Sequence, residues 1–256
     1  MRRLTLVLAL LVPAEAAGLE QEDATQHEPP VSEATSEGSY LPGLLPASTM
    51  QQAAVVRVLG GYDSSVESGV FDSDVRVRLF GPLTLRGGAT FSERNQTLRP
   101  RIGAAVQVLS QGKQGVDGTV ALSYKAEGFT EPEGELELEV AVGHRWGSVL
   151  GVVNLAYGQD PEGNERDGEL RLGAQAELAT HLHAGLAGTL RVGLGEGMSE
   201  AAMEERGELD FVVGPTVAYA FHHFALFAQA GLSVVQLKDE SFHSGAVVVC
   251  GVGTAF

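Results

Sequence analysis

Apolar and polar side chains alternate along much of the chain that follows residue 50. In residues 135–142, a glutamate or alanine at every odd position alternates with a leucine or valine at every even position. Successive side chains on a β-strand point to opposite faces, so this pattern makes one face apolar and the other polar or small. On a helix the same carboxylates would spread around the axis and interrupt any apolar stripe. The pattern therefore predicts β-strands.

Copies of this pattern, separated by turn signals, predict about twelve strands between residues 51 and 256. A count of about ten to twelve strands is compatible with the pattern. Their lengths are close to the ~9–11 residues with which a tilted strand crosses a bilayer. Short connections alternate with longer ones, as in a transmembrane antiparallel up-and-down β-barrel with short periplasmic turns and long outer loops. An even number of strands places the first and last residues of the barrel segment on the same, periplasmic side. The predicted strands are residues 53–62, 70–80, 83–94, 97–109, 118–129, 134–144, 148–158, 168–179, 182–194, 208–221, 224–237 and 242–256.

Aromatic side chains fall mainly near the ends of these strands. Aromatic residues at both ends of the strands favour a barrel in lipid, because aromatic rings prefer the two interfaces of a bilayer. A soluble sandwich would instead place large aromatic residues in the middle of its strands. The residues predicted at the periplasmic ends are Trp146, Tyr219, Phe221, Phe224 and Phe256, and those at the outer ends are Tyr62, Phe71, Phe91, Tyr157, Phe211 and Phe242.

The last predicted strand ends in an aromatic residue, Phe256, with apolar residues before it at alternate positions, namely Val252, Cys250 and Val248. This pattern resembles the C-terminal strand of bacterial outer-membrane β-barrel proteins, the class that includes porins. Thr254 departs from the pattern. The resemblance implies an all-β barrel in the outer membrane, and it implies that these four residues form the signal recognised by the barrel-insertion machinery.

Composition narrows the range of functions. The chain of 256 residues has 17 basic and 33 acidic residues, a formal net charge of −16, and one cysteine. The excess of acid argues against a nucleic-acid partner, which needs a basic surface, and the single cysteine excludes a disulfide framework. The predicted outer loops hold many of the acids, among them Asp63, Asp72 and Asp167. Such loops are solvated, and divalent cations could also bridge them to lipopolysaccharide.

The first fifty residues differ from the rest. Residues 1–16 combine a positive head, an apolar stretch and a small-x-small site, which predicts a secretory signal peptide. Residues 17–50 are acidic, contain prolines and have no Lys or Arg. We interpret them as a flexible periplasmic segment ahead of the barrel at 51–256, because they have little apolar surface to offset the entropy of ordering. The apolar stretch 41–46 leaves two alternatives open, a plug or a partner motif.

The polar face of the predicted strands would line the lumen. Basic residues gather on the second to fourth strands, and acidic residues gather on the sixth to eighth. Two arrangements compete: patches of opposite sign that face each other across water, or a buried ion-pair network that fills the interior. The predicted lumen-lining residues are Arg76, Arg78, Arg86, Arg99, Arg101, Glu135, Glu137, Glu139, Glu169, Arg171 and Glu177.

Histidines and serines supply weaker candidates. Five histidines (His144, His181, His183, His222 and His223) fall at the predicted periplasmic turns, where imidazoles could bind a transition metal. No carboxylate stands near them in sequence, and histidine suits a membrane interface, so we predict neither a metal nor a cofactor. Ser241, His243 and Ser244 resemble parts of a hydrolase site, but no nucleophile motif accompanies them. We therefore predict no catalytic residue.

The sequence favours a narrow, porin-like channel for small solutes with a charged lumen. A structural or adhesive barrel without conductance is the main alternative, and an outer-membrane hydrolase is a third. The expected partners are outer-membrane lipid and lipopolysaccharide, the insertion machinery and small solutes.

Overall fold

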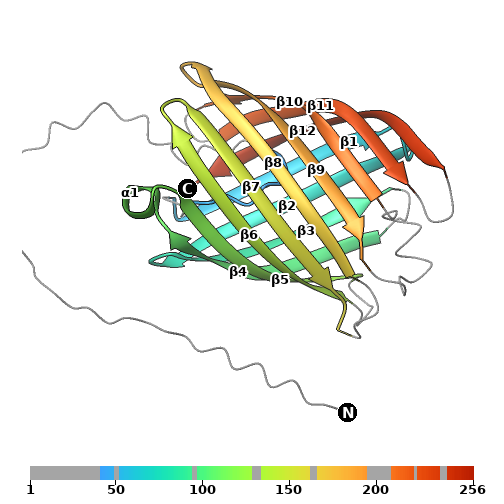
Figure 1. Ribbon diagram of the computed structural model, residues 1–256, viewed down its shortest axis with the longest axis horizontal. Coiled ribbons are helices and arrows are strands. Elements are labelled where there is room, and N and C mark those ends of the chain that lie inside the picture. Colours follow the sequence, from blue (N-terminus) through green and yellow to red (C-terminus); the bar gives the residue numbers. More distant parts are fainter. Residues whose placement is uncertain are drawn as a thin grey trace, which may run out of the picture. The chain divides into compact units, whose positions relative to one another are not determined.

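Twelve antiparallel strands pair with their neighbours in chain order, and the first strand pairs with the last, so the sheet closes into a barrel (Figure 1). The computed structural model describes residues 41–48, 52–93, 97–128, 134–161, 166–194, 209–221, 224–236 and 241–256. All of them belong to one compact unit of the chain. The predicted signal peptide and residues 17–40 lie outside the described residues.

The observed strands follow the predicted ones within a few residues at each end. They are β1 (Ala54–Asp63), β2 (Ser68–Phe80), β3 (Leu83–Ser92), β4 (Thr97–Leu109), β5 (Asp117–Ala126), β6 (Gly134–Trp146), β7 (Val149–Gln159), β8 (Arg166–Ala179), β9 (Leu182–Gly193), β10 (Leu209–Ala220), β11 (Phe224–Gln236) and β12 (Phe242–Ala255).

Alternation of side chains determines which face of each strand is outside. On β6, Leu136 and Leu138 are exposed, whereas the alternating Glu137 and Glu139 are buried. Antiparallel partners share a face, and the register carries this alternation around the ring: Leu138 lies opposite Tyr157 on β7, and Glu139 lies opposite Ala156. The exposed face is therefore apolar, and the buried charges are inside the barrel.

Closure joins the two ends of the sheet. β1 and β12 pair over nine positions, for example Val58 with Val252, and the Phe256 amide donates to the Ala54 carbonyl. Both ends of the barrel chain therefore lie at one end of the barrel, together with the connection that holds the short helix α1 (Gln111–Gln114) (Figure 1). We call this end of the barrel the termini end.

Some boundaries differ from prediction. β6 continues two residues beyond its predicted end at 144, to Trp146, and the turn follows at residues 147–148, where the φ of 60° at Gly147 suits glycine. Asp63, Asp72 and Asp167 lie within strands rather than in outer loops, so their assignment to loops was wrong. β1 and β8 extend beyond their predicted ends to include Asp63 and Asp167, whereas Asp72 already lay within the predicted strand 70–80.

Exposed aromatic rings form clusters at the termini end. Tyr219 lies edge-on to Phe221 at 4.9 Å, and Phe221 stacks on Phe224 at 4.5 Å across the β10–β11 connection. Tyr62, Phe71 and Phe242 are exposed at the opposite end. Two aromatic belts with aliphatic side chains between them match the two interfaces of a bilayer. Among the helices that the structure describes, none is long and apolar enough to cross a membrane.

Candidate functional site

Ion pairs connect side chains around much of the inner wall. On the β2 side, three guanidinium groups converge on Asp74: its carboxylate is 2.6 Å from Arg76, 3.5 Å from Arg101 and 4.0 Å from Arg86. These side chains come from β2, β3 and β4, and all are largely shielded from solvent. Asp74 thus neutralises part of the basic patch from within it.

Glu139 on β6 is the centre of the network. Its side chain is 1% exposed and accepts from Arg86 Nη1 at 3.0 Å, from Arg171 Nη1 at 3.0 Å and from Asn154 Nδ2 at 2.9 Å. β4 and β5 separate the strands of Arg86 and Glu139, so this ion pair reaches over two strands. A buried carboxylate with three donors is stabilised by charge-assisted hydrogen bonds, which offset the cost of removing it from water.

The network continues on both sides of Glu139. Lys125 on β5 lies 3.1 Å from Glu137 and 3.7 Å from Glu135. Arg171 also contacts Glu169 at 2.5 Å, and further toward the end opposite the termini Arg191 pairs with Asp167 at 2.7 Å. Of the two arrangements that the sequence left open, the structure has the one in which acidic and basic side chains are in contact.

The register places every predicted lumen-lining residue on the inner face of its strand. Nine are buried or partly buried, whereas Arg78 and Glu177 are exposed near the termini end. The sequence analysis missed Asp74, Lys125 and Asn154 as members of the network. Asp74 could have been found, because it lies two residues before Arg76 and so shares its face. The nine buried or partly buried lumen-lining residues are Arg76, Arg86, Arg99, Arg101, Glu135, Glu137, Glu139, Glu169 and Arg171.

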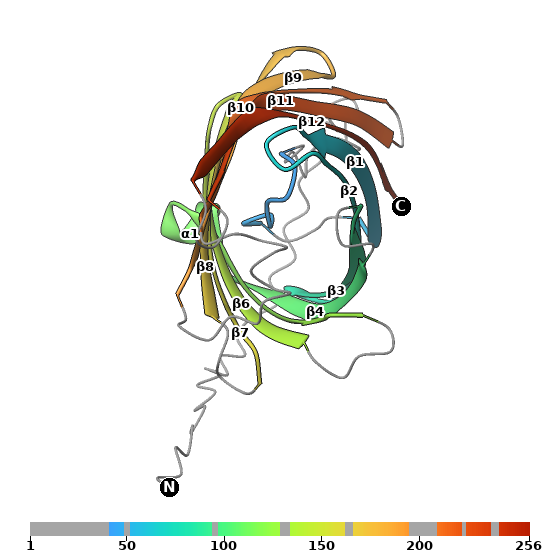
Figure 2. The same cartoon turned by 90° about the vertical axis from the view of Figure 1, so that its right-hand side faces the viewer.

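Residues 41–48 lie inside the ring of strands, where Figure 2 shows them in blue. This stretch, the lumen segment, packs its apolar side chains on the wall, and Leu41, Leu44, Leu45 and Ala47 are all buried. For these eight residues the structure differs from the interpretation as a flexible segment, because their apolar side chains pack in defined places on the inner wall. The reason is local composition, since they are the apolar part of an otherwise acidic stretch.

Side chains of the wall hold the lumen segment through its backbone carbonyls. Arg171 Nη1 donates to the Gly43 carbonyl at 3.2 Å, and Asn154 Nδ2 donates to the Leu45 carbonyl at 3.3 Å. Thr119 Oγ1 donates to the Ala47 carbonyl at 2.8 Å. Arg171 and Asn154 are the same residues that contact Glu139, so the ion-pair network orients the groups that bind the segment.

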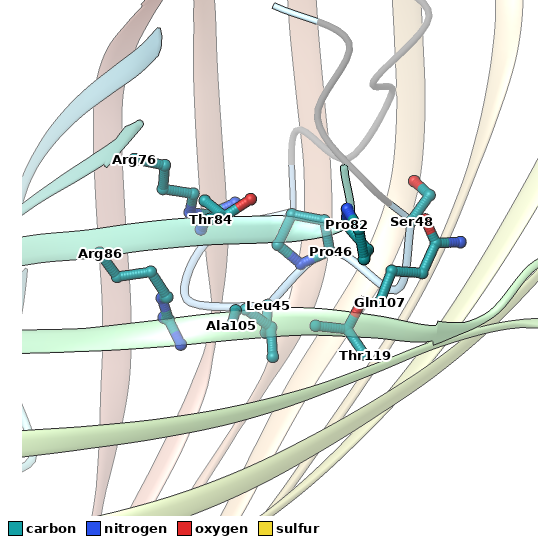
Figure 3. Close-up of a pocket in the computed structure, with 10 residues that line it drawn as sticks. All are labelled: Leu45, Pro46, Ser48, Arg76, Pro82, Thr84, Arg86, Ala105, Gln107 and Thr119. Atoms are coloured by element: carbon teal, nitrogen blue, oxygen red, sulfur yellow. The ribbon is translucent and has the colours of Figure 1, made fainter. Parts of the chain in front are cut away.

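A cavity of about 20 Å³, enough for about one water molecule, lies between the lumen segment and the β2–β5 wall. Figure 3 shows the side chains around it, which come from the segment, from β2 to β5 and from the β2–β3 turn. They are Leu45, Pro46, Ser48, Arg76, Pro82, Thr84, Arg86, Ala105, Gln107 and Thr119.

The connection between β1 and β2 folds over the inner face at the end opposite the termini. Ser233 on β11 donates to Asp63 at 2.6 Å, and Ser65 donates to the same carboxylate at 2.7 Å. Gly245 on β12 permits this approach, because a Cβ there would collide with the backbone of Ser65. This connection narrows the barrel mouth on the side away from the lumen segment.

Two of the predicted histidines contact aromatic rings at the termini end. His144 packs on Trp146 with ring centres 4.4 Å apart, and His181 lies edge-on to Tyr219. No group of three potential ligands is placed to hold a metal among the described residues. His243 lies on the inner face of β12 and Ser244 on the outer face, while His222 and His223 lie outside the described residues.

The predicted insertion signal lies on the outer face of β12. Val248, Cys250, Val252 and Phe256 are all exposed. They therefore continue the apolar surface that the barrel presents to its surroundings.

A closed barrel with an apolar outer face, aromatic ends and a charged interior is the architecture of a transmembrane β-barrel. The sequence matches no model of a protein family and no curated protein. Solved porins match in fold. The NanC porin has a TM-score of 0.57 and 9% sequence identity, and the match covers 78% of this chain and 100% of NanC. The KdgM porin, also solved in complex with disordered oligogalacturonate, has a TM-score of 0.57 and 7% identity over 79% of this chain and 99% of KdgM. This chain therefore has a porin-like, twelve-stranded outer-membrane barrel fold.

Proposed function

We propose that this protein is a narrow channel in the bacterial outer membrane that passes small polar solutes. The observation that carries the proposal is a band of charged side chains inside a closed barrel whose outside is apolar. Charged groups in a membrane protein are costly and usually line a path for polar molecules. The fold shared with two porins supports the same function.

The termini end would face the periplasm, because the predicted signal peptide and linker precede β1 at that end. The opposite end, with its long acidic connections, would face outward toward lipopolysaccharide. Apolar residues between the two aromatic belts would contact outer-membrane lipid. Enzymatic activity is not part of the proposal, because no nucleophile motif accompanies Ser241, His243 and Ser244 in the sequence.

The solute would be small and polar rather than a simple anion or cation. Acidic and basic side chains are paired along the wall, as with Lys125 beside Glu135 and Glu137. Such a lumen orients a solute that carries both charges or a strong dipole, and it favours neither sign strongly.

Single-channel recording in planar bilayers tests the proposal. We expect small unitary currents with weak ion selectivity. The variant Lys125→Gln removes the positive charge that faces two glutamates, so the cation-to-anion permeability ratio should rise by about twofold. The measurement is the reversal potential in a salt gradient.

Lys113→Gln is the matched control for this experiment, because Lys113 lies in α1 outside the barrel wall. Its permeability ratio should equal that of the unsubstituted protein. Absence of current from the well-inserted protein and from every variant of its lumen would refute the channel function.

A structural barrel without conductance is the second candidate. The observation that favours it is the cross-strand pair of Arg86 and Glu139, which helps to fill the interior. A pure structural role predicts that no change inside the lumen produces current, so the same single-channel recordings separate the two functions.

The exposed aromatic Phe256 supplies a further prediction. If Phe256 is part of an insertion signal, Phe256→Ala should slow assembly by the insertion machinery by about tenfold. A tenfold change corresponds to a loss of ~1.4 kcal/mol in the free energy with which the machinery binds the signal. The folded fraction in proteoliposomes that contain the machinery measures this. Phe224→Ala is the control, because Phe224 is also an exposed aromatic at the termini end. Equal rates for the two variants would contradict a specific role for Phe256.

A further inference from the structure

The inner wall beneath the lumen segment is organised in rows that run across the strands. In the middle row, the register joins Thr119, Ala141, Asn154 and Arg171 on four consecutive strands, β5 to β8. Three of these four residues donate hydrogen bonds to the lumen segment, and the fourth is small. The segment therefore lies across the strands along one row of the wall.

The spacing of the row matches an extended peptide. Thr119 and Arg171 are separated by three strand spacings, or ~14 Å. The carbonyls that they bind belong to Ala47 and Gly43, and four extended residues cover ~13–14 Å. The bound carbonyls are at alternate positions, 43, 45 and 47, as they are on one side of an extended chain. A segment without a defined position on the wall would not show this agreement between the spacing of its carbonyls and the spacing of the strands.

Rows on either side accept the apolar side chains. On one side, Leu41 and Leu44 pack with Val152 and Ala187, next to Gly173. A Cβ at Gly173 would collide with Leu41, and a Cβ at Gly143 would be 2.8 Å from the Ala47 methyl group. On the other side, Leu45 packs with Ala105 and Ala121, and it also packs with Ala141 of the middle row. The wall is thus hollowed where the segment needs room.

The segment itself is suited to this position. Pro42 and Gly43 form a turn, in which Gly43 has a φ of 72° that few other residues adopt. Pro42 and Pro46 have no backbone N–H, so the segment brings fewer donors that need partners into the barrel. Residues 49–53 alone separate the segment from β1, which tethers it to the termini end.

We propose that these rows form a binding site for an extended apolar peptide, and that residues 41–48 fill the site in cis and close most of the lumen. The site comprises the donors Thr119, Asn154 and Arg171 with the small residues Gly143 and Gly173. The contacts of the segment reach from Gly173 on β8 to the cavity beside Arg76 on β2. Its bonds to the wall come from side chains rather than from strand pairing, so it can leave without breaking the barrel. This inference rests on the proposed channel function.

Deletion of residues 41–48 from the full chain tests the closure. We expect the unitary conductance to rise by about threefold or more, because the segment occupies a large share of a twelve-strand lumen. Gly173→Leu should raise conductance in the same direction by displacing Leu41 while leaving the segment in the chain. Gly87→Leu on β3 is the control for the glycine-to-leucine change itself, because Gly87 lies on the outer face, opposite the exposed Ile102, away from the lumen segment.

A synthetic peptide with the sequence of residues 41–48 tests the binding site itself. Added to the deletion variant at about millimolar concentration, comparable to the effective concentration of a tethered segment, it should restore the low conductance. A peptide of the same composition in scrambled order should leave the current unchanged. Heat-modifiable gel mobility confirms that each variant is folded before recording.

The outcomes separate the two proposals. Equal conductance of the unsubstituted protein, the deletion variant and Gly173→Leu would overturn the closure and leave the channel function intact. A rise in conductance that both peptides fail to reverse, or reverse equally, would overturn the peptide site. Absence of current from every inserted variant, the deletion included, would overturn the channel function and the closure with it.

Discussion

Replacing Glu139 with leucine should lower the free energy of unfolding by about 3–5 kcal/mol, the usual cost of removing one partner from a buried ion pair. The substitution leaves the Arg86 and Arg171 guanidinium groups inside the barrel without the carboxylate that both contact. It also removes an acceptor from Asn154, so the lumen segment loses part of its support. Urea unfolding of the protein in lipid vesicles measures the change.

Two further variants sharpen this result. Glu139→Gln keeps the shape and one acceptor, so its cost should fall between zero and that of leucine. Glu177→Leu removes an exposed carboxylate on the same face and should change stability by less than about 1 kcal/mol. A cost for Glu139→Leu as small as that for Glu177→Leu would show that the network contributes nothing to the folded state.

Arginine in place of Leu155 should cost about 2–4 kcal/mol when the barrel is folded into a bilayer. Leu155 is 59% exposed and lies in the middle of β7 on the outer face. If that face contacts lipid, the guanidinium group must enter the hydrocarbon region or distort it. The same urea titration gives the free energy of unfolding.

A leucine near the end of a strand, at the membrane interface rather than in its middle, supplies the control for this substitution. Leu178 is 66% exposed, and it lies one residue from the end of β8. Leu178→Arg should cost only about 0–1 kcal/mol, because the interface solvates the charge. Similar costs at the two positions would argue against a membrane-embedded outer face.

The ion-pair network and the lumen segment act on the same part of the wall. Glu139 binds Arg171 and Asn154, and these two residues bind the Gly43 and Leu45 carbonyls. Arg171 and Asn154 therefore belong both to the ion-pair network and to the set of side chains that hold the segment.

Local pattern was enough to predict the strands and their faces. The alternation in 135–142 gives β6 its buried glutamates and exposed leucines, and the aromatic positions mark the strand ends. Prediction failed where the chain departs from the pattern, as at Asp63 and Asp167, which extend their strands with polar residues. It also failed for residues 41–48, because a short apolar stretch does not indicate which surface it will contact.

By itself, the sequence determined an antiparallel barrel of about twelve strands with an apolar outside and a charged inside, because side-chain direction on a strand depends only on whether a position is odd or even. Only the tertiary structure decided which charges meet and what fills the lumen. Arg86 reaches Glu139 over two intervening strands, and Gly43 reaches Arg171 from a segment more than a hundred residues away in the chain. Such contacts depend on closure of the ring and on register between strands, and neither is encoded in the spacing of neighbouring residues.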